Sequence, residues 1–131
     1  MACILLADDD DDMVDICSRL LPRRGHQLLV ARNAADAVKL AEAHQPDLIL
    51  MDMRMPLSAD ETVSDRAGIE ATRRVKALPA LAAIPVVALT GHMMTKFRDS
   101  ILEAGCVDLL SKPIEAFADL FAVIDKHLPK P

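Results

Sequence analysis

Five short apolar runs alternate with longer segments of helical periodicity along this chain. The apolar runs predict β-strands at residues 2–7, 27–31, 47–52, 84–89 and 107–110. The segments between and after them predict helices at residues 12–24, 34–44, 67–77, 94–104 and 115–127. Several runs are continuous rather than alternating, which is typical of parallel strands covered on both faces. The pattern therefore predicts a doubly wound α/β fold with right-handed crossovers.

Local signals support several of these boundaries. Asn33, with Asp36 three residues later, has the form of a helix N-cap followed by an acid in the first turn. Gly25 and Gly105 follow helical patterns, where a left-handed C-cap would need glycine. One apolar stripe in the last helix predicts a core-facing surface made of Phe117, Leu120, Phe121, Ile124 and Leu128.

Composition narrows the class of protein. The 131 residues predict one domain, residues 1–131, with no linker and no output domain. The net charge of −5 and the absence of Trp and Tyr argue against nucleic-acid binding. No apolar stretch approaches the ~18 residues of a membrane span, and the N-terminus lacks the basic flank of a signal peptide, so we expect a cytoplasmic protein. Cys3, Cys17 and Cys106 lie in apolar contexts and are expected to be small buried hydrophobes.

Chemically distinct polar residues follow the predicted strands. Asp8 and Asp9 end the first apolar run and Asp52 ends the third, while Thr90 and Lys112 follow the last two. Ligands of open α/β sheets bind beyond the carboxyl ends of the strands, so these side chains are expected to converge there. An acid at one strand end is commonly only a helix cap, and it is the combination that indicates a site.

The combination suits a divalent cation and a phosphoryl group. Crowded carboxylates repel one another unless a cation neutralises them, and Mg²⁺, with Mn²⁺ as the alternative, prefers such oxygen ligands. A carboxylate can then act as nucleophile toward phosphorus, Lys112 can neutralise one phosphoryl oxygen, and Thr90 can donate to another. Lys112–Pro113 is a candidate cis peptide that would aim the lysine inward. Asp10 to Asp12 are expected to be first-turn acids of a helix rather than ligands.

Five segments together resemble the receiver domain of two-component response regulators: ILLADDD, PDLILMDMRMP, GIEATRRVKAL, IPVVALTGH and EAGCVDLLSKP. The resemblance spans essentially the whole chain. It implies a flavodoxin-like (βα)5 fold with strand order 2-1-3-4-5. It also implies that Asp52 is the phosphoacceptor, and that Asp9 and the main-chain carbonyl of Arg54 complete the direct Mg²⁺ ligands. Asp8 would then act mainly through a metal-bound water.

The resemblance assigns further roles near the phosphoacceptor. Thr90 would be the switch hydroxyl, Lys112 the site lysine, and Gly91 the small residue that the family prefers after its threonine. Arg54 and His92 occupy positions that flank the attacking water in the family and tune phosphate lifetime. For His92, an exposed loop histidine with no role is an equally good interpretation.

Two features depart from the family pattern. The position three residues before the lysine usually holds Tyr or Phe, and here it holds Leu109, which puts the usual coupling between hydroxyl and aromatic in doubt. Eleven residues separate Pro56 from Gly68, where the family has only a few. This insertion, Leu57 to Ala67, is predicted to be irregular, and it contains the acids Asp60, Glu61 and Asp65.

The leading hypothesis is a stand-alone receiver that is phosphorylated on Asp52 by a histidine kinase or a histidine phosphotransfer protein. It would be a monomer or a weak phosphorylation-dependent dimer, and a phosphoacceptor that assists its own chemistry rather than an enzyme. Phosphorylation would change its affinity for a downstream protein. A degenerate receiver that binds constitutively is one alternative, kept open by Leu109. An aspartyl-phosphate phosphohydrolase is another, although Arg54 stands where such enzymes need a second Asp.

Overall fold

Five parallel strands form one central sheet in the computed structural model, which describes residues 2–91 and 96–128. In spatial order they are β2 (Gln27–Ala31), β1 (Cys3–Ala7), β3 (Leu48–Asp52), β6 (Val86–Thr90) and β7 (Asp108–Ser111). Counted along the chain, these are the second, first, third, fourth and fifth strands of the sheet. The flavodoxin-like order 2-1-3-4-5 is therefore confirmed.

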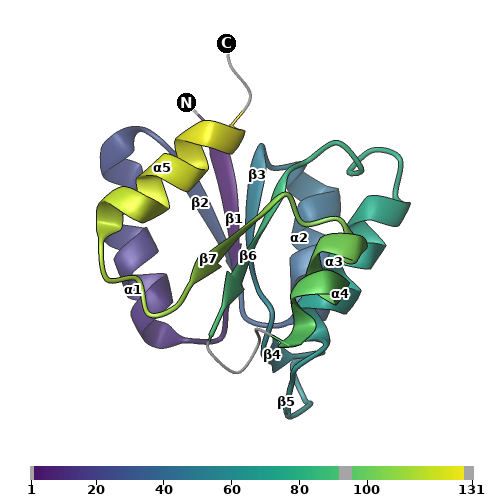
Figure 1. Cartoon of the computed structure of the whole chain (residues 1–131). Coiled ribbons are helices and arrows are strands. Elements are labelled where there is room, and N and C mark those ends of the chain that lie inside the picture. Colours follow the sequence, from purple (N-terminus) through teal and green to yellow (C-terminus); the bar gives the residue numbers. More distant parts are fainter. Residues whose placement is uncertain (1, 92–95, 129–131) are drawn as a thin grey trace.

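Helices cover both faces of the sheet (Figure 1). The helices are α1 (Asp11–Leu20), α2 (Ala34–His44), α3 (Ala67–Ala77), α4 (Arg98–Ala104) and α5 (Phe117–His127). α1 and α5 pack on one face, and α2, α3 and α4 on the other. Because β1, β3 and β6 lie in the interior of the sheet with helices on both sides, their runs Ile4–Ala7, Leu48–Asp52 and Val86–Thr90 are buried throughout. This burial explains why their sequences are continuously apolar.

The strand predictions are confirmed to within two residues, and the largest difference is at the start of the fourth strand of the sheet. The run predicted at 84–89 forms β6 at Val86–Thr90, because Pro85 lacks the N–H of a ladder donor and Ile84 closes a turn on Leu81. Thr90 is therefore the last residue of its strand rather than the residue after it.

The helix predictions for 34–44 and 67–77 are confirmed at both ends. Asn33 caps α2, since its Oδ1 accepts from the Asp36 N–H at 2.8 Å. The first helix ends earlier than predicted, at Leu20, and a 3₁₀ turn, η1 (Pro22–Arg24), completes the segment. Gly25 follows that turn with φ 86°. The predicted start of the fourth helix, residues 94 and 95, lies outside the described residues, and α4 itself begins at Arg98.

Three predictions about side-chain environment need correction. Leu120 and Ile124 of α5 are buried, but Phe117 is 46% exposed because it is the first residue of the helix and lies beyond the edge of the core. Cys17 and Cys106 are buried, whereas Cys3 is only partly buried at the start of β1. Asp10 is the N-cap of α1 rather than a first-turn acid, and its Oδ1 accepts from the Asp12 N–H at 3.0 Å.

Most of the insertion lacks regular structure, as predicted, but Val63–Ser64 within it forms a strand. β4 (Met55–Pro56) and β5 (Val63–Ser64) pair as a short antiparallel ribbon, which projects below the sheet in Figure 1. The strands are two residues long, so period-two patterning had too few positions to show them. No helix of the described residues is both long and apolar enough to cross a bilayer.

Candidate functional site

The register of the sheet gathers the predicted residues at one edge. Ala7 of β1 lies beside Met51 of β3. Asp8 is the residue after Ala7 and Asp52 is the residue after Met51, so the two aspartates come at the same level of neighbouring strands. Asp52 in turn pairs with Leu89 of β6. Thr90 pairs with Ser111, which places Lys112 directly after the end of β7. Residues spread over more than a hundred positions thus meet at the carboxyl end of the sheet.

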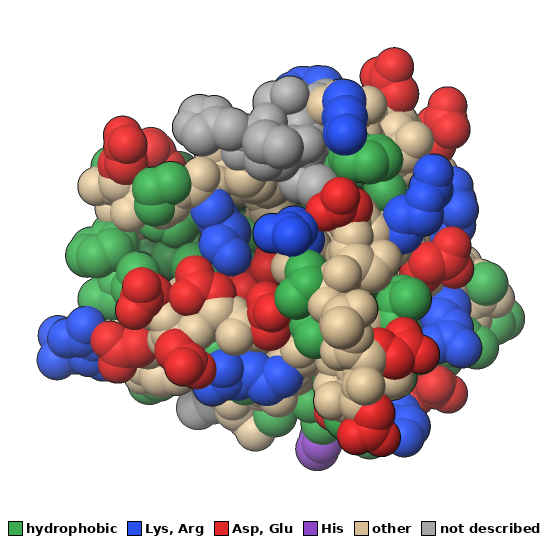
Figure 2. Space-filling view, turned by 90° about the horizontal axis from the view of Figure 1, so that it is seen from below, with side chains coloured by type: hydrophobic (Ala, Val, Ile, Leu, Met, Phe, Trp, Pro, Cys, Tyr) green, Lys and Arg blue, Asp and Glu red, His purple; other side chains and the backbone are tan. Residues whose placement is uncertain are grey.

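Three carboxylates form the centre of this site. Asp8, Asp9 and Asp52 each offer a carboxylate oxygen, and these atoms all lie within 4.8 Å of one another. Asp8 and Asp52 are buried, while Asp9 is exposed. Figure 2, a view of this edge of the molecule, shows acidic side chains gathered near the centre with basic ones beside them.

Main-chain amides hold the two buried carboxylates. The Asp10 N–H donates to Asp8 Oδ1 at 2.9 Å, and the Arg54 N–H donates to Asp52 Oδ1 at 3.3 Å. Each bond forms between residues two apart, just past the end of a strand, so the local backbone itself fixes each carboxylate. The second oxygens, Asp8 Oδ2 and Asp52 Oδ2, face Lys112.

The Lys112 ammonium bridges the carboxylates. Its Nζ lies 2.9 Å from Asp8 Oδ2 and 3.5 Å from Asp52 Oδ2, and 3.8 Å from Asp10 Oδ2. Burial alone would lower the pKa of Lys112, but the hydrogen bond to Asp8 and the negative charges of Asp52, Asp8 and Asp10 raise it overall. The lysine is therefore a fixed cation within the cluster. The Lys112–Pro113 peptide is cis, as predicted.

The single positive charge of Lys112 does not balance the negative charges of Asp52 and the neighbouring aspartates. Burial, and then the charge and hydrogen bond of Asp8, raise the pKa of Asp52 to about 8, against the lowering effects of Lys112 and of the Arg54 N–H. A carboxylate whose pKa lies this high is largely protonated at neutral pH unless further positive charge stabilises its ionised form. The three carboxylates thus offer a hard, oxygen-only ligand set of the kind that Mg²⁺ or Mn²⁺ binds.

The remaining predicted residues are at or near the site. Thr90 ends β6 and is buried, and its carbonyl accepts from the Lys112 N–H at 2.7 Å, which ties the two strand ends together. Gly91 follows, and no atom of the described residues lies within 4 Å of the place where a Cβ on it would stand. Arg54 directs its side chain toward the ribbon, where its Nε lies 3.0 Å from Asp65 Oδ1. His92 lies outside the described residues.

Two contributors were missed by the sequence reasoning. Gly68 lies so close to the backbone at the end of β3 that an added Cβ would fall 2.4 Å from the Asp52 carbonyl oxygen and 2.6 Å from Met53 Cα. Its N–H also donates to the Met53 carbonyl at 3.2 Å. The other is the ion pair that Asp65 forms with Arg54: this acid was named from the sequence, but its pairing depends on the ribbon, which was not predicted.

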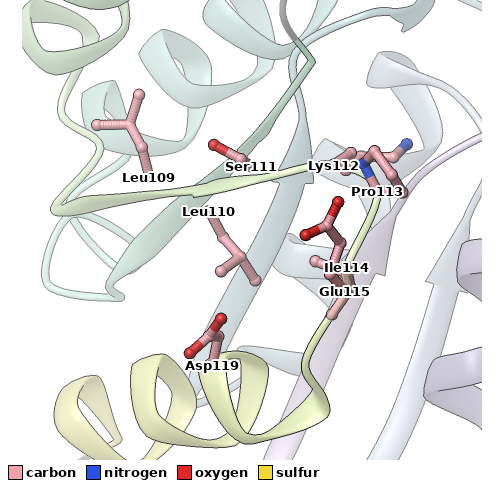
Figure 3. A pocket seen from close by; sticks show the side chains of 8 residues that line it. All are labelled: Leu109, Leu110, Ser111, Lys112, Pro113, Ile114, Glu115 and Asp119. Carbon is pink, nitrogen blue, oxygen red and sulfur yellow. The ribbon is translucent and has the colours of Figure 1, made fainter.

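A pocket of about 390 Å³ adjoins the site along β7 and the segment that leads to α5. In Figure 3, Leu109 and Leu110 point to opposite sides of the strand, and Lys112 and Pro113 lie at the end nearest the site. Leu109, where the family usually has an aromatic, is partly buried and packs against the core. The pocket is thus lined by a smaller side chain than the family pattern would give it.

Comparison with known proteins agrees with this geometry. Residues 4–125 match the family model of the response regulator receiver domain. The chain is 32% identical over 111 residues to the polar-differentiation response regulator DivK of Brucella anthropi. The aligned residues make up 85% of this chain and 84% of that protein.

Solved structures show the same fold. The receiver domain of a sensor histidine kinase from Pseudomonas aeruginosa PAO1, with magnesium coordinated in its active-site cleft, superposes with a TM-score of 0.82 and 28% identity over 96% of both chains. The Vibrio cholerae chemotaxis protein CheY4, at 22% identity, gives a TM-score of 0.84 over 98% of this chain and 99% of that one.

Proposed function

This chain belongs to the response regulator receiver domain family of two-component signalling, and on that premise we propose that it is a switch operated by phosphorylation of Asp52. The observation that carries the proposal is the placement of the Asp52 carboxylate. It lies among two further carboxylates and beside the Lys112 ammonium, at the end of a central strand. A nucleophile and the groups that neutralise a phosphoryl oxygen thus share one site.

The chemistry is transfer of a phosphoryl group from a phosphohistidine donor. An oxygen of the Asp52 carboxylate attacks phosphorus, and an O–P bond forms. The P–N bond to the imidazole breaks, and the imidazole nitrogen keeps the electron pair. Lys112 already lies 3.5 Å from Asp52 and is positioned to pair with a phosphoryl oxygen, while the Thr90 hydroxyl can donate to another.

Mg²⁺, or Mn²⁺ in its place, would be held by Asp9, Asp52 and the main-chain carbonyl of Arg54, with Asp8 acting through water. The fit is supported by three carboxylates whose oxygens lie within 4.8 Å of one another, and by the pKa of Asp52, which burial and the neighbouring Asp8 raise to about 8. When bound, the ion would neutralise carboxylate and phosphoryl oxygens alike. The ionised, nucleophilic form of Asp52 would then prevail at neutral pH.

The protein donor would be a histidine kinase or a histidine phosphotransfer protein, and the output would be altered affinity for a downstream protein. Receiver domains of two-component systems work between such partners. In this proposal the chain is a phosphoacceptor that assists its own phosphorylation and dephosphorylation, rather than a multiple-turnover enzyme.

The proposal is tested by incubating the protein with acetyl phosphate and Mg²⁺ and trapping the acyl phosphate with borohydride. Mass spectrometry should then find the label on Asp52, and neither chelator-treated protein nor Asp52→Asn should be labelled. Asp36→Asn, which removes a carboxylate in α2 away from the cluster, is the matched control and should label normally. Labelling that persists in Asp52→Asn, or that ignores the chelator, would reject the assignment.

A further inference from the structure

The ribbon of β4 and β5 is fastened to the body of the domain at its base. Met55 of β4 is fully buried, and the Leu57 carbonyl accepts from the Ala35 N–H of α2 at 2.9 Å. At the other end, the Arg66 N–H donates to Ser64 Oγ at 3.1 Å, immediately before α3. The backbone after Asp52 thus leads directly into a ribbon that hydrogen bonds and burial hold against the domain. Side chains near the base of the ribbon therefore have defined positions relative to the site.

Arg54 links the ribbon to the phosphoacceptor. Its main-chain N–H donates to Asp52 Oδ1, so its side chain starts beside that carboxylate. The side chain nevertheless turns to the ribbon, where Nε lies 3.0 Å from Asp65 Oδ1. Both side chains are largely exposed, 63% for Arg54 and 47% for Asp65. The pair is therefore weak enough to exchange partners.

The other two acids of the ribbon differ from Asp65. Asp60 and Glu61 are exposed in the turn, where the Glu61 N–H donates to the Ser58 carbonyl at 3.1 Å. Neither forms an ion pair among the described residues. Asp60 consequently carries the same charge as Asp65 on the same element without contacting Arg54. This difference gives a matched control.

We infer that Asp65 is a positioning residue: it holds the Arg54 guanidinium on the ribbon and so keeps it from pairing with phosphoryl oxygens at Asp52. This inference rests on the proposed function. A guanidinium binds phosphate oxygens through two parallel hydrogen bonds, and Asp65 is its competitor for that role. The insertion thereby limits the positive charge that an anionic donor encounters and favours donors that bind through their own protein surface.

The test compares Asp65→Ala with Asp60→Ala in labelling by acetyl phosphate at low salt. Asp65→Ala should lower the half-saturating donor concentration about threefold, a size set by the exposure of the pair, with little change in the maximal rate. Asp60→Ala should have the half-saturating donor concentration of the wild type. Asp65→Glu, which keeps the carboxylate, should have it as well. High salt should reduce the effect, because exposed charges are screened. In an Arg54→Gln background, Asp65→Ala should have no effect.

A second readout follows Arg54 itself. Addition of beryllofluoride, an analogue of the phosphoryl group, should shift the Arg54 Nε–H signal in the NMR spectrum more in Asp65→Ala than in wild type. Wild-type protein that takes no label would reject the proposed function and this inference together. If the wild type is labelled but Asp65→Ala behaves as Asp60→Ala does, only this inference is overturned. An effect that survives in Arg54→Gln would overturn it equally.

Discussion

The Lys112 ammonium lies 2.9 Å from Asp8 Oδ2, a contact between residues 104 positions apart in the chain. Asp8 is fully buried and Lys112 is mostly so, which means that the two charges compensate each other within the protein. A buried carboxylate deprived of its cation is costly. The contact therefore joins the first and last strands, in chain order, of the central sheet through charge as well as packing.

Replacement of Lys112 by Met should slow phosphorylation of Asp52 by about tenfold to a hundredfold, because a charge on the phosphoryl oxygens is lost. The same variant should bind Mg²⁺ several-fold more tightly, since the ammonium no longer shares the carboxylates with the metal. Labelling kinetics and a metal titration would measure both. Weaker Mg²⁺ binding in Lys112→Met would show that the lysine organises the carboxylates instead of competing for them.

Thr90→Ala should separate phosphorylation from its consequences. Thr90 is buried at the end of β6, and in the proposed mechanism its hydroxyl donates to the phosphoryl group on Asp52 without taking part in the bond changes of the transfer. Labelling should stay within about threefold of wild type, while the amide-exchange changes induced by beryllofluoride should shrink. Thr90→Ser, which keeps the hydroxyl, is the control. A full response in Thr90→Ala would show that the hydroxyl has no switching role.

The pKa of Asp52 predicts how stability depends on pH without metal. Its value rises from 3.8 to about 8 on folding, so the folded state binds the proton more tightly. Stability from this group is complete below the unfolded value and is lost as pH rises toward about 8. Asp52→Asn should therefore stabilise the chelator-treated protein by about 1–3 kcal/mol at pH 8, and by little at pH 4.

Urea unfolding of wild type and Asp52→Asn across that pH range would measure this difference, with Asp60→Asn as the control for loss of one exposed charge. Saturating Mg²⁺ should reverse the order at pH 8, because the ion binds the folded wild type. A stability gap that does not change between pH 4 and 8 would contradict the raised pKa.

Much of the fold could be predicted from the sequence, because burial of a strand on both faces leaves a direct pattern of apolar residues. Continuous apolar runs are dictated by burial on both faces, so β1 and β3 were found almost residue for residue. The site followed as well, because parallel strands present their carboxyl ends together, and the ends carried Asp8, Asp52 and Lys112. No single residue was sufficient to predict the site, because an acid at one strand end can equally be a helix cap; only the set of strand ends together indicates a site.

The features that were missed depend on contacts between segments. The two-residue strands β4 and β5 are defined by pairing with each other, not by a period in the sequence. Asp65 and Arg54 meet only because that ribbon folds back. The tight approach of Gly68 to Asp52 needs the position of α3, which sequence spacing does not supply.

Gly68→Ala should displace the backbone of Asp52 and Met53 and so disturb the site. The new Cβ would meet the Asp52 carbonyl oxygen and Met53 Cα at 2.4 and 2.6 Å, and neither backbone atom can move without shifting β3 or α3. We expect a loss of stability of about 2–4 kcal/mol and slower labelling of Asp52. A Cβ added at Gly91 would have no atom of the described part of the chain within 4 Å, so Gly91→Ala is the matched control by thermal unfolding. Equal stability of the two variants would mean that α3 yields easily.

Leu109 predicts the form of the response on the surface made by α4, β7 and α5. Leucine is partly buried against the core and has no polar tip that could exchange partners between solvent and interior, as a tyrosine can. Beryllofluoride should therefore shift amide NMR signals around Asp52 strongly and those of α4 and α5 weakly. Leu109→Tyr adds a ring beside a pocket of about 390 Å³ and should enlarge the shifts on that surface. Leu109→Met, of similar volume and without a ring, should behave as wild type does. Large shifts across α4 and α5 in the wild type would show that the aromatic is dispensable for this switch.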